Sequence, residues 1–243
     1  FPVVRRAQDI ANNLLIQAAK QDEHCVLLDI GMGTGQQAAT LISQMAHRQL
    51  PLRQITLIGV EPSGESMAAA RQRFEALPAE TGIAINFTGL QKTVEDLDTD
   101  DWTAIRQQIQ AGGGKLLLNA SFTLHHVRPV AFRTPFFRQL KALQPEVFVI
   151  IEPYGDYVTE NLHERFQYAW HHYGLTFQAI DTIDASDEEK SAVKRVFFGR
   201  ELPDVMAEQD RVEQYETAEM WLAHLADADF QPVSIPMPEY RDF

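Results

Sequence analysis

The chain has 243 residues, of which 45% are hydrophobic and 23% are charged. This is the composition of a folded globular protein with one sizeable core, and it excludes a disordered tail, a collagen and a disulfide-stapled miniprotein. With 21 Lys and Arg residues against 34 Asp and Glu residues, the formal net charge of -13 repels nucleic-acid phosphates and anionic lipid surfaces. Neither nucleic acid nor a membrane is therefore expected as a partner.

Cys25 is the one cysteine, so no internal disulfide can form and a reducing compartment, the cytoplasm, is expected. No run of residues approaches the roughly 18 apolar positions that a membrane-spanning helix needs. No charged-then-apolar leader opens the chain. Membrane insertion and secretion are therefore not predicted.

Short apolar runs alternate with amphipathic stretches along the first two thirds of the chain, which is typical of a parallel sheet with crossover helices. In chain order the pattern predicts a helix over 5–19, a strand over 25–30, a helix over 36–49, a strand over 55–60, a helix over 64–77 that stops at Pro78, and a strand over 83–87. It continues with a helix over 102–110, a strand over 115–119, a helix over 132–143 and a strand over 147–151. The predicted fold class is α/β, a doubly wound, mostly parallel, Rossmann-like sheet.

The remaining third departs from this alternation. Residues 159–226 are mainly helical in pattern and carry little strand signal, and 230–235 returns to a strand. We therefore predict one domain over 1–243, with a core of 20–155 and 228–243, an N-terminal helix over 5–19, and a helical cap inserted at 156–227.

The clearest motif is an apolar strand that ends in an acid and three alternating glycines, at Asp29, Gly31, Gly33 and Gly35. Glycine lets a loop lie flat against a ligand, and the following helix offers free N–H groups there. A dinucleotide-binding loop needs glycine at the position of Gln36, so the spacing favours S-adenosylmethionine (SAM) over NAD. A tight turn without a ligand would also use these glycines. We expect this loop, with Met32 and Gln36, to contact the cofactor.

A second acid stands at the end of the next strand, at Glu61, followed by Pro62. A carboxylate at the carboxyl edge of an open α/β sheet can accept both hydroxyl protons of a ribose. Both SAM and NAD carry such a ribose, so Glu61 supports a nucleoside ligand without choosing between them. A purely structural role, at the start of the next helix, is the alternative. After the third strand, Val94 and Glu95 are candidates to hold the adenine.

Polar residues also follow the last two strands of the predicted sheet. Asn119 and Ser121 are candidates to bind the cofactor, and His125 and His126 to accept a proton near neutral pH. Glu152 is a further candidate base or substrate anchor, with a buried acid paired to a cation as its alternative. The pairs His163-Glu164 and His171-His172 lack the spacing of a zinc-binding helix, so no metal is predicted.

Three segments together resemble one family, the GRAS proteins. Residues 116–126 are similar to its Val-Asn-(five residues)-Leu-His core. Residues 145–152, with Asn161 and the region 165–177, are similar to its Pro-x-Val-x-x-x-x-Glu, Arg-Phe and Tyr-Tyr region. Residues 211–216, Trp221 and 229–233 are similar to its closing pattern. The chain departs at Asp229, where the family usually has glycine, and at His172-Tyr173 in place of two tyrosines.

The resemblance implies a class I methyltransferase core with a helical cap. Plant members are transcriptional regulators, whereas bacterial members are associated with small-molecule methylation. Because this chain retains the full glycine loop and Glu61, the resemblance favours the bacterial type. The family pattern also extends further in both directions, so both ends of the chain are expected to be trimmed.

The sequence therefore predicts a SAM-dependent methyltransferase that methylates an oxygen or nitrogen of a small molecule under the cap. The residues expected on the substrate side are Phe122, Tyr154, Asn161 and Trp221, and the order of candidate bases is His126 or His125, then Glu152. The acidic chain favours a neutral or cationic acceptor. Two alternatives stay open, a regulatory module that binds a ligand without turnover and a nicotinamide oxidoreductase.

Overall fold

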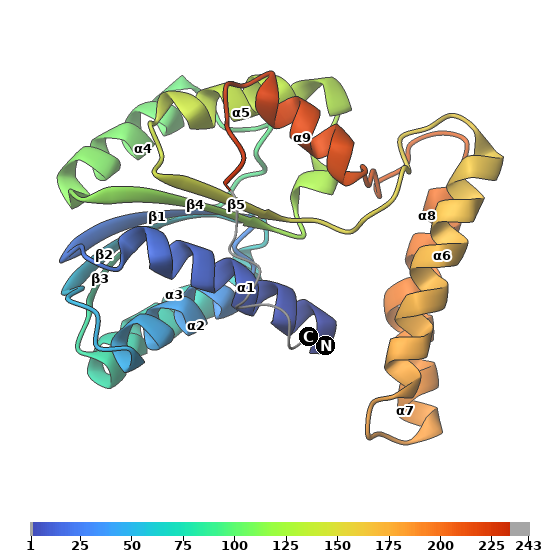
Figure 1. Ribbon diagram of the computed structural model, residues 1–243, viewed down its shortest axis with the longest axis horizontal. Helices are drawn as coiled ribbons and strands as arrows, with labels where there is room; N and C mark the ends of the chain where they lie inside the picture. Colours follow the sequence, from blue (N-terminus) through green and yellow to red (C-terminus); the bar gives the residue numbers. More distant parts are fainter. Residues whose placement is uncertain (1, 234–243) are drawn as a thin grey trace.

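The centre of the molecule is a five-stranded, wholly parallel sheet with the strand order β3-β2-β1-β4-β5 (Figure 1). The computed structural model describes residues 2–233. The strands are β1 (His24–Ile30), β2 (Gln54–Val60), β3 (Ala84–Leu90), β4 (Lys115–Ser121) and β5 (Val147–Ile151). Their apolar runs are continuous because helices cover both faces of the sheet. The α/β, doubly wound fold class is confirmed.

The helices before β3 and three of the helices after β3 cover opposite faces of the sheet (Figure 1). One face carries α1 (Pro2–Ala19), α2 (Gln36–His47) and α3 (Gly64–Thr81), whose buried side chains share a core with Leu27 and Leu57. The other carries α4 (Thr99–Gly112), α5 (Arg133–Ala142) and α9 (Ala218–Ala226), which share a second core with Leu28 and Ile58. The chain therefore reverses its winding between β1 and β4, where open α/β sheets bind ligands.

The helices between β5 and α9 form an arm beyond the carboxyl edge of the sheet (Figure 1). The arm consists of α6 (Leu162–Asp181), α7 (Asp187–Val193), the π-helical turn η3 (Lys194–Phe198) and α8 (Gly199–Met206). Its own small core of buried residues is Tyr157, Ala169, Tyr173, Val205 and Tyr215. No helix of the described residues is long and apolar enough to cross a membrane.

Several element boundaries differ from the sequence prediction. Helix α3 continues through Pro78 and ends at Gly82, which has a φ of +72° and donates its N–H to the Pro78 carbonyl over 2.9 Å. Proline fits the φ of a helix and removes only one hydrogen bond, so a last turn survives here. Glycine at a left-handed position then ends the helix.

The two ends of the predicted cap also differ in structure. Helix α9 lies inside the range 156–227 but packs on α5, with Trp221 in the core beneath it. Phe230 to Val233 is irregular rather than a strand, and Pro232 has no N–H for a sheet ladder. The last predicted strand residues, 234 and 235, lie outside the described residues. The helical insertion above the sheet edge is thus shorter than its predicted range.

Candidate functional site

The glycine loop joins β1 to α2 at the carboxyl edge of the sheet. Gly31, Gly33 and Gly35 have φ values of +67°, +56° and +71°, in the left-handed region that favours glycine. The N–H groups of Gly31 and Met32 donate to the Val60 carbonyl over 2.8 and 3.1 Å, which fixes the loop to the end of β2. Glycine is therefore needed at these three positions, because a residue with a side chain would be strained in this backbone conformation.

The three glycines have different surroundings. A Cβ at Gly31 would lie 2.1 Å from the Thr123 hydroxyl oxygen, and a Cβ at Gly35 would lie 2.5 Å from the Phe74 ring. A Cβ at Gly33 would meet nothing within 4 Å. Gly31 and Gly35 are therefore required by packing inside the protein. Gly33 faces open space, as a position that must accommodate a ligand would.

Glu61 reaches back over this loop from the end of β2. Its two carboxylate oxygens accept the N–H groups of Gly33, over 2.9 Å, and Ser63, over 2.8 Å. A carboxylate has about four acceptor positions, so lone pairs remain for hydroxyl groups of a ligand. The predicted pairing of glycine loop and acid is therefore a direct contact in the structure.

The residues beneath the loop form a buried polar chain instead of facing the ligand space. Asp29 and Asn119 are register partners on β1 and β4, and the Asn119 side-chain amide donates to Asp29 over 2.8 Å. The Gln37 amide then donates to Asn119 over 3.3 Å and to Asn12 over 3.4 Å, and the Ser121 hydroxyl also donates to Asn119, over 3.3 Å. Asp29 and Asn119, predicted to contact the cofactor, thus support the loop from below.

Burial raises the pKa of Asp29 to about 7, although the hydrogen bond from Asn119 acts in the opposite direction. The folded state therefore binds a proton more tightly than the unfolded chain, whose Asp pKa is about 3.9. Stability contributed by this proton is lost as the pH rises from about 4 to about 7.

We expect Asp29→Asn, which mimics the protonated acid, to remove this dependence. Relative to the variant, the free energy of unfolding of the natural chain should fall by up to about 1.4 kcal/mol per pH unit and level off above pH 7. Urea unfolding of both proteins at pH 5, 6, 7 and 8 measures the difference. A difference that stays constant over this range would show that Asp29 is already ionised at pH 5.

A cavity of about 1310 Å³ opens beside the glycine loop. Its lining includes five residues predicted to contact the cofactor, together with Val60. The five are Gly31, Glu61, Pro62, Val94 and Glu95. The other lining residues come from the segments after β4 and after α8, and include Phe122, Thr123, His126, Arg128, Arg211 and Val212. The charged lining residues are five acids and three cations, namely Glu61, Glu95, Glu160, Glu208, Asp210, Lys92, Arg128 and Arg211. The cavity therefore joins the glycine loop to the histidine segment in one space with a slight excess of negative charge.

The remaining predicted cofactor residues lie near the loop without lining this cavity. Met32 is buried, with its sulfur over Gly59. Gln36 donates along α2 to the Thr40 hydroxyl over 3.3 Å and lines a groove between α2 and α3. The side chains of both residues are thus turned away from the cavity by their own helix and strand contacts.

The candidate bases have different environments. His126 is exposed and lines the cavity. Desolvation, with the neighbouring His125, lowers the pKa of His126 to about 4, so its imidazole is neutral at pH 7. His125 is buried, and its Nδ1 is hydrogen-bonded to Glu152.

Glu152 is occupied by the loop that it supports. One carboxylate oxygen accepts the N–H groups of Thr123 and Leu124, over 2.9 and 2.6 Å, and the other contacts His125. Its side chain is 2% exposed. Glu152 is therefore buried, as in its structural alternative, but its partners are backbone N–H groups and His125, not a lysine or arginine. It positions the histidine segment.

Of the predicted substrate residues, Phe122 alone is among the cavity-lining residues. Asn161 begins α6, where its side chain accepts the N–H groups of His163 and Glu164. Trp221 is buried with the Arg133 guanidinium 4.7 Å above its ring, and Tyr154 is exposed, with its backbone bridged to Glu216. These three residues therefore cap, fill or connect elements of the fold. Asn161 and Trp221 belong to the family pattern, which reflects packing as well as binding.

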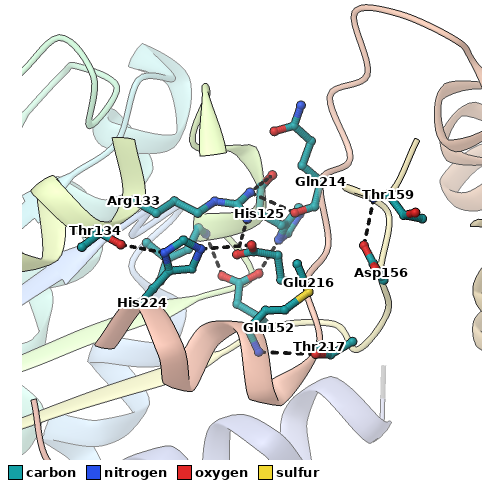
Figure 2. A network of polar contacts seen from close by, with 12 residues as sticks. His125, Arg133, Thr134, Glu152, Asp156, Thr159, Gln214, Glu216, Thr217 and His224 are labelled. Atoms are coloured by element: carbon teal, nitrogen blue, oxygen red, sulfur yellow. Dashed lines mark hydrogen bonds and ion pairs between the residues drawn. The ribbon is translucent and has the colours of Figure 1, made fainter. Parts of the chain in front are cut away.

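The structure adds two groups of residues that sequence reasoning missed. Glu213 places a carboxylate oxygen 3.4 Å from Nε2 of His125. Arg133 and Glu216 form a buried ion pair that also holds the carbonyls of His125 and Gln214 (Figure 2). In the sequence, Glu213 and Glu216 stand out only as part of the acidic segment 208–219 and of the family pattern over 211–216. Neither feature indicates that they contact His125 and Arg133, about 80 residues earlier in the chain.

Comparison with known proteins gives matches over most of the chain. The model of the GRAS domain family matches residues 1–241. Scarecrow-like protein 1 of Arabidopsis thaliana is 26% identical over 91% of this chain and 39% of its own length. Scarecrow-like transcription factor PAT1 of the same plant is 23% identical over 91% of this chain and 47% of its own length. The chain thus spans less than half the length of these relatives.

Among solved structures, a SAM-dependent methyltransferase from Methanosarcina mazei superposes with a TM-score of 0.45 and 14% identity, over 90% of this chain and 85% of its own. The match to the family model, in contrast, runs through the glycine loop, the histidine segment and the arm without interruption. The chain belongs to the GRAS domain family.

Proposed function

We propose that this chain binds SAM at the glycine loop and transfers its methyl group to an oxygen or nitrogen of a small molecule in the adjoining cavity. The observation that carries the proposal is that Gly31, Glu61 and His126 line one and the same cavity. Retention of the whole glycine loop favours the bacterial, small-molecule type of GRAS protein acting in the cytoplasm. The excess of acidic lining residues favours a neutral or cationic acceptor.

The residues present fit the cofactor. Gly33 leaves the space that a ligand needs, and the left-handed conformations of Gly31, Gly33 and Gly35 shape the loop around it. The carboxylate of Glu61 is fixed by two backbone N–H groups and keeps acceptor capacity for the two ribose hydroxyls. SAM would supply a methyl group on a sulfonium that is already activated, with sulfur keeping the electron pair of the broken bond.

The protein's own contribution is then mainly positional. Holding donor and acceptor in line across the cavity supplies much of the rate, and the acceptor must lose one proton. His126 is the exposed nitrogen base that lines this cavity, and Glu152 fixes the segment that carries it. A pKa of about 4 makes His126 a weak proton acceptor, so we expect orientation to outweigh base catalysis.

Binding calorimetry tests the cofactor assignment, with S-adenosylhomocysteine, SAM and NADH as ligands. We expect the two sulfur nucleosides to bind and NADH not to compete. Glu61→Ala removes a charged hydrogen-bond acceptor and should weaken their binding roughly 10- to 100-fold. Glu160→Ala, which removes an exposed lining acid from the segment between β5 and α6, is the matched control and should leave the affinity unchanged.

A second candidate function is a ligand-binding module without catalysis. It is favoured by the family itself, since a relative of this chain is named a transcription factor. Binding of S-adenosylhomocysteine with no methyl transfer to any acceptor would support this candidate. Tighter binding of NADH than of either sulfur nucleoside would overturn both candidates and favour the oxidoreductase.

A further inference from the structure

Three potential metal ligands converge at the histidine segment, and one of them, His126, lines the cavity. His125 and His126 lie on the turn η1 (Leu124–His126) after β4, and Glu213 lies on the segment after α8. One ligand atom from each lies within 4.8 Å of the other two. These residues differ from the pairs His163-Glu164 and His171-His172, whose spacing in the sequence does not fit a zinc-binding helix.

His125 has the support that metal-binding histidines characteristically have. Its Nδ1 is bonded to the Glu152 carboxylate, whose other oxygen is fixed by two backbone N–H groups (Figure 2). The edge of the Tyr215 ring packs against its imidazole at 4.8 Å. A carboxylate on one ring nitrogen sets the tautomer and directs the other nitrogen toward a metal. That other nitrogen, Nε2, faces Glu213.

The spacing also fits a tetrahedral transition-metal ion. Metal–ligand distances of about 2.0–2.1 Å in a zinc site place neighbouring ligand atoms roughly 3.4 Å apart. His125 Nε2 and a Glu213 oxygen are 3.4 Å apart. The His126 ring lies 3.9 Å from the His125 ring, centre to centre, and one of its nitrogens lies within 4.8 Å of both other ligand atoms.

The local charge favours a cation at this place. The carboxylates of Glu152 and Glu213 approach His125 from its two ring nitrogens, with side chains 2% and 13% exposed. Within residues 2–233, neither has an ion pair with a lysine or arginine, and the nearby Arg133 is paired with Glu216. Hydrogen bonds satisfy the oxygens of Glu152 but supply no full positive charge, and a buried carboxylate without a cation is costly. A divalent ion bound here would balance both carboxylates.

We propose that His125, His126 and Glu213 bind a divalent transition metal ion, and Zn²⁺ is the ion that fits these ligands. Two imidazoles and one carboxylate match zinc, whereas magnesium and calcium prefer oxygen ligands alone. The cavity that His126 lines would supply the fourth ligand. The role of the ion rests on the proposed function. There it would bind the acceptor hydroxyl and lower its pKa, so that the proton leaves to solvent before the oxygen takes the methyl group.

Cobalt(II) spectroscopy tests the site without any cofactor or activity. The purified full chain is stripped of metal and titrated with Co²⁺ and, by calorimetry, with Zn²⁺. We expect one equivalent to bind and to give the visible absorption of tetrahedral cobalt. His126→Ala and Glu213→Gln should each weaken binding 100-fold or more, and Glu152→Gln, which acts through His125, about 10- to 100-fold.

His171→Ala is the matched control, since this exposed histidine lies on α6 and also has a histidine neighbour. Binding should be unchanged in that variant. Loss of binding in His171→Ala with retention in His126→Ala, or no stoichiometric binding in the natural chain, would overturn the proposal. Metal binding without S-adenosylhomocysteine binding would refute the proposed function alone, and the reverse result would refute the metal site alone. Circular dichroism of each variant separates ligand loss from unfolding.

Discussion

Replacing Gly33 by leucine is expected to abolish binding of S-adenosylhomocysteine while the protein still folds. A Cβ at this position meets no atom of the protein within 4 Å, so a leucine side chain would extend into the open space beside the loop. The φ of +56° costs about 1–2 kcal/mol for a residue with a Cβ, which most folded domains tolerate. Calorimetry should show a loss of affinity of roughly 100-fold or more, about 2.7 kcal/mol.

Gly82→Leu provides the control for backbone strain. Gly82 has a φ of +72° and also meets nothing within 4 Å, but it ends α3 at the opposite edge of the sheet, before β3 begins. The two variants should lose similar stability in urea, and only Gly33→Leu should lose the ligand. If both variants bind S-adenosylhomocysteine like the natural chain, the cofactor does not lie on this loop. Gly31→Leu is uninformative here, because its side chain would collide with Thr123.

The sheet and the loop were predictable because their signals are local. Continuous apolar runs between polar turns identified all five strands, and β1 begins and ends within one residue of its predicted range. The glycine spacing depends on backbone conformation, and Gly31, Gly33 and Gly35 all have positive φ. Glu61 follows from its place at the end of β2, because parallel strands bring their carboxyl ends to one edge.

The inner residues of the site were not predictable because tertiary contacts decide their roles. Asn119 is the last residue of its predicted strand, but it lies inside β4, where its register partner on β1 is the buried Asp29, which binds it. Trp221 was expected on the substrate side and fills the core because α9 packs on α5. Glu213 meets His125 only through the path of the chain after α8, which no local pattern records.

Removal of the Arg133 side chain is expected to cause the largest loss of stability. Its guanidinium is 1% exposed and pairs with Glu216, while it donates to the carbonyls of His125, over 3.1 Å, and Gln214, over 2.9 Å (Figure 2). Arg133→Met keeps the volume but leaves a buried carboxylate without its cation. Breaking a buried pair in this way costs about 3–5 kcal/mol. Urea unfolding measures this loss.

Arg138→Met and the double variant Arg133→Met, Glu216→Gln separate the causes of that loss. Arg138, on the same helix, is exposed and donates to the Asp227 carbonyl, so its removal should cost within about 0.5 kcal/mol. The double variant removes both charges, so it should be more stable than Arg133→Met and less stable than the natural chain. Equal effects of Arg133→Met and Arg138→Met would show that the buried pair does not hold the loop.

The pH dependence of the Arg133→Met effect identifies the charge responsible. Burial alone would raise the pKa of Glu216, but the hydrogen bond from His224 and the charge of Arg133 outweigh it and hold the pKa below its usual value. An acid with a lowered pKa stabilises the fold above the pKa of the unfolded chain, about 4.3 for Glu, and this stabilisation is lost as the pH falls. The difference between natural chain and variant should therefore be full at pH 7 and shrink below about pH 4. Since the same arginine holds the backbone of His125 and Gln214, the histidine wall of the cavity should loosen in the same pH range.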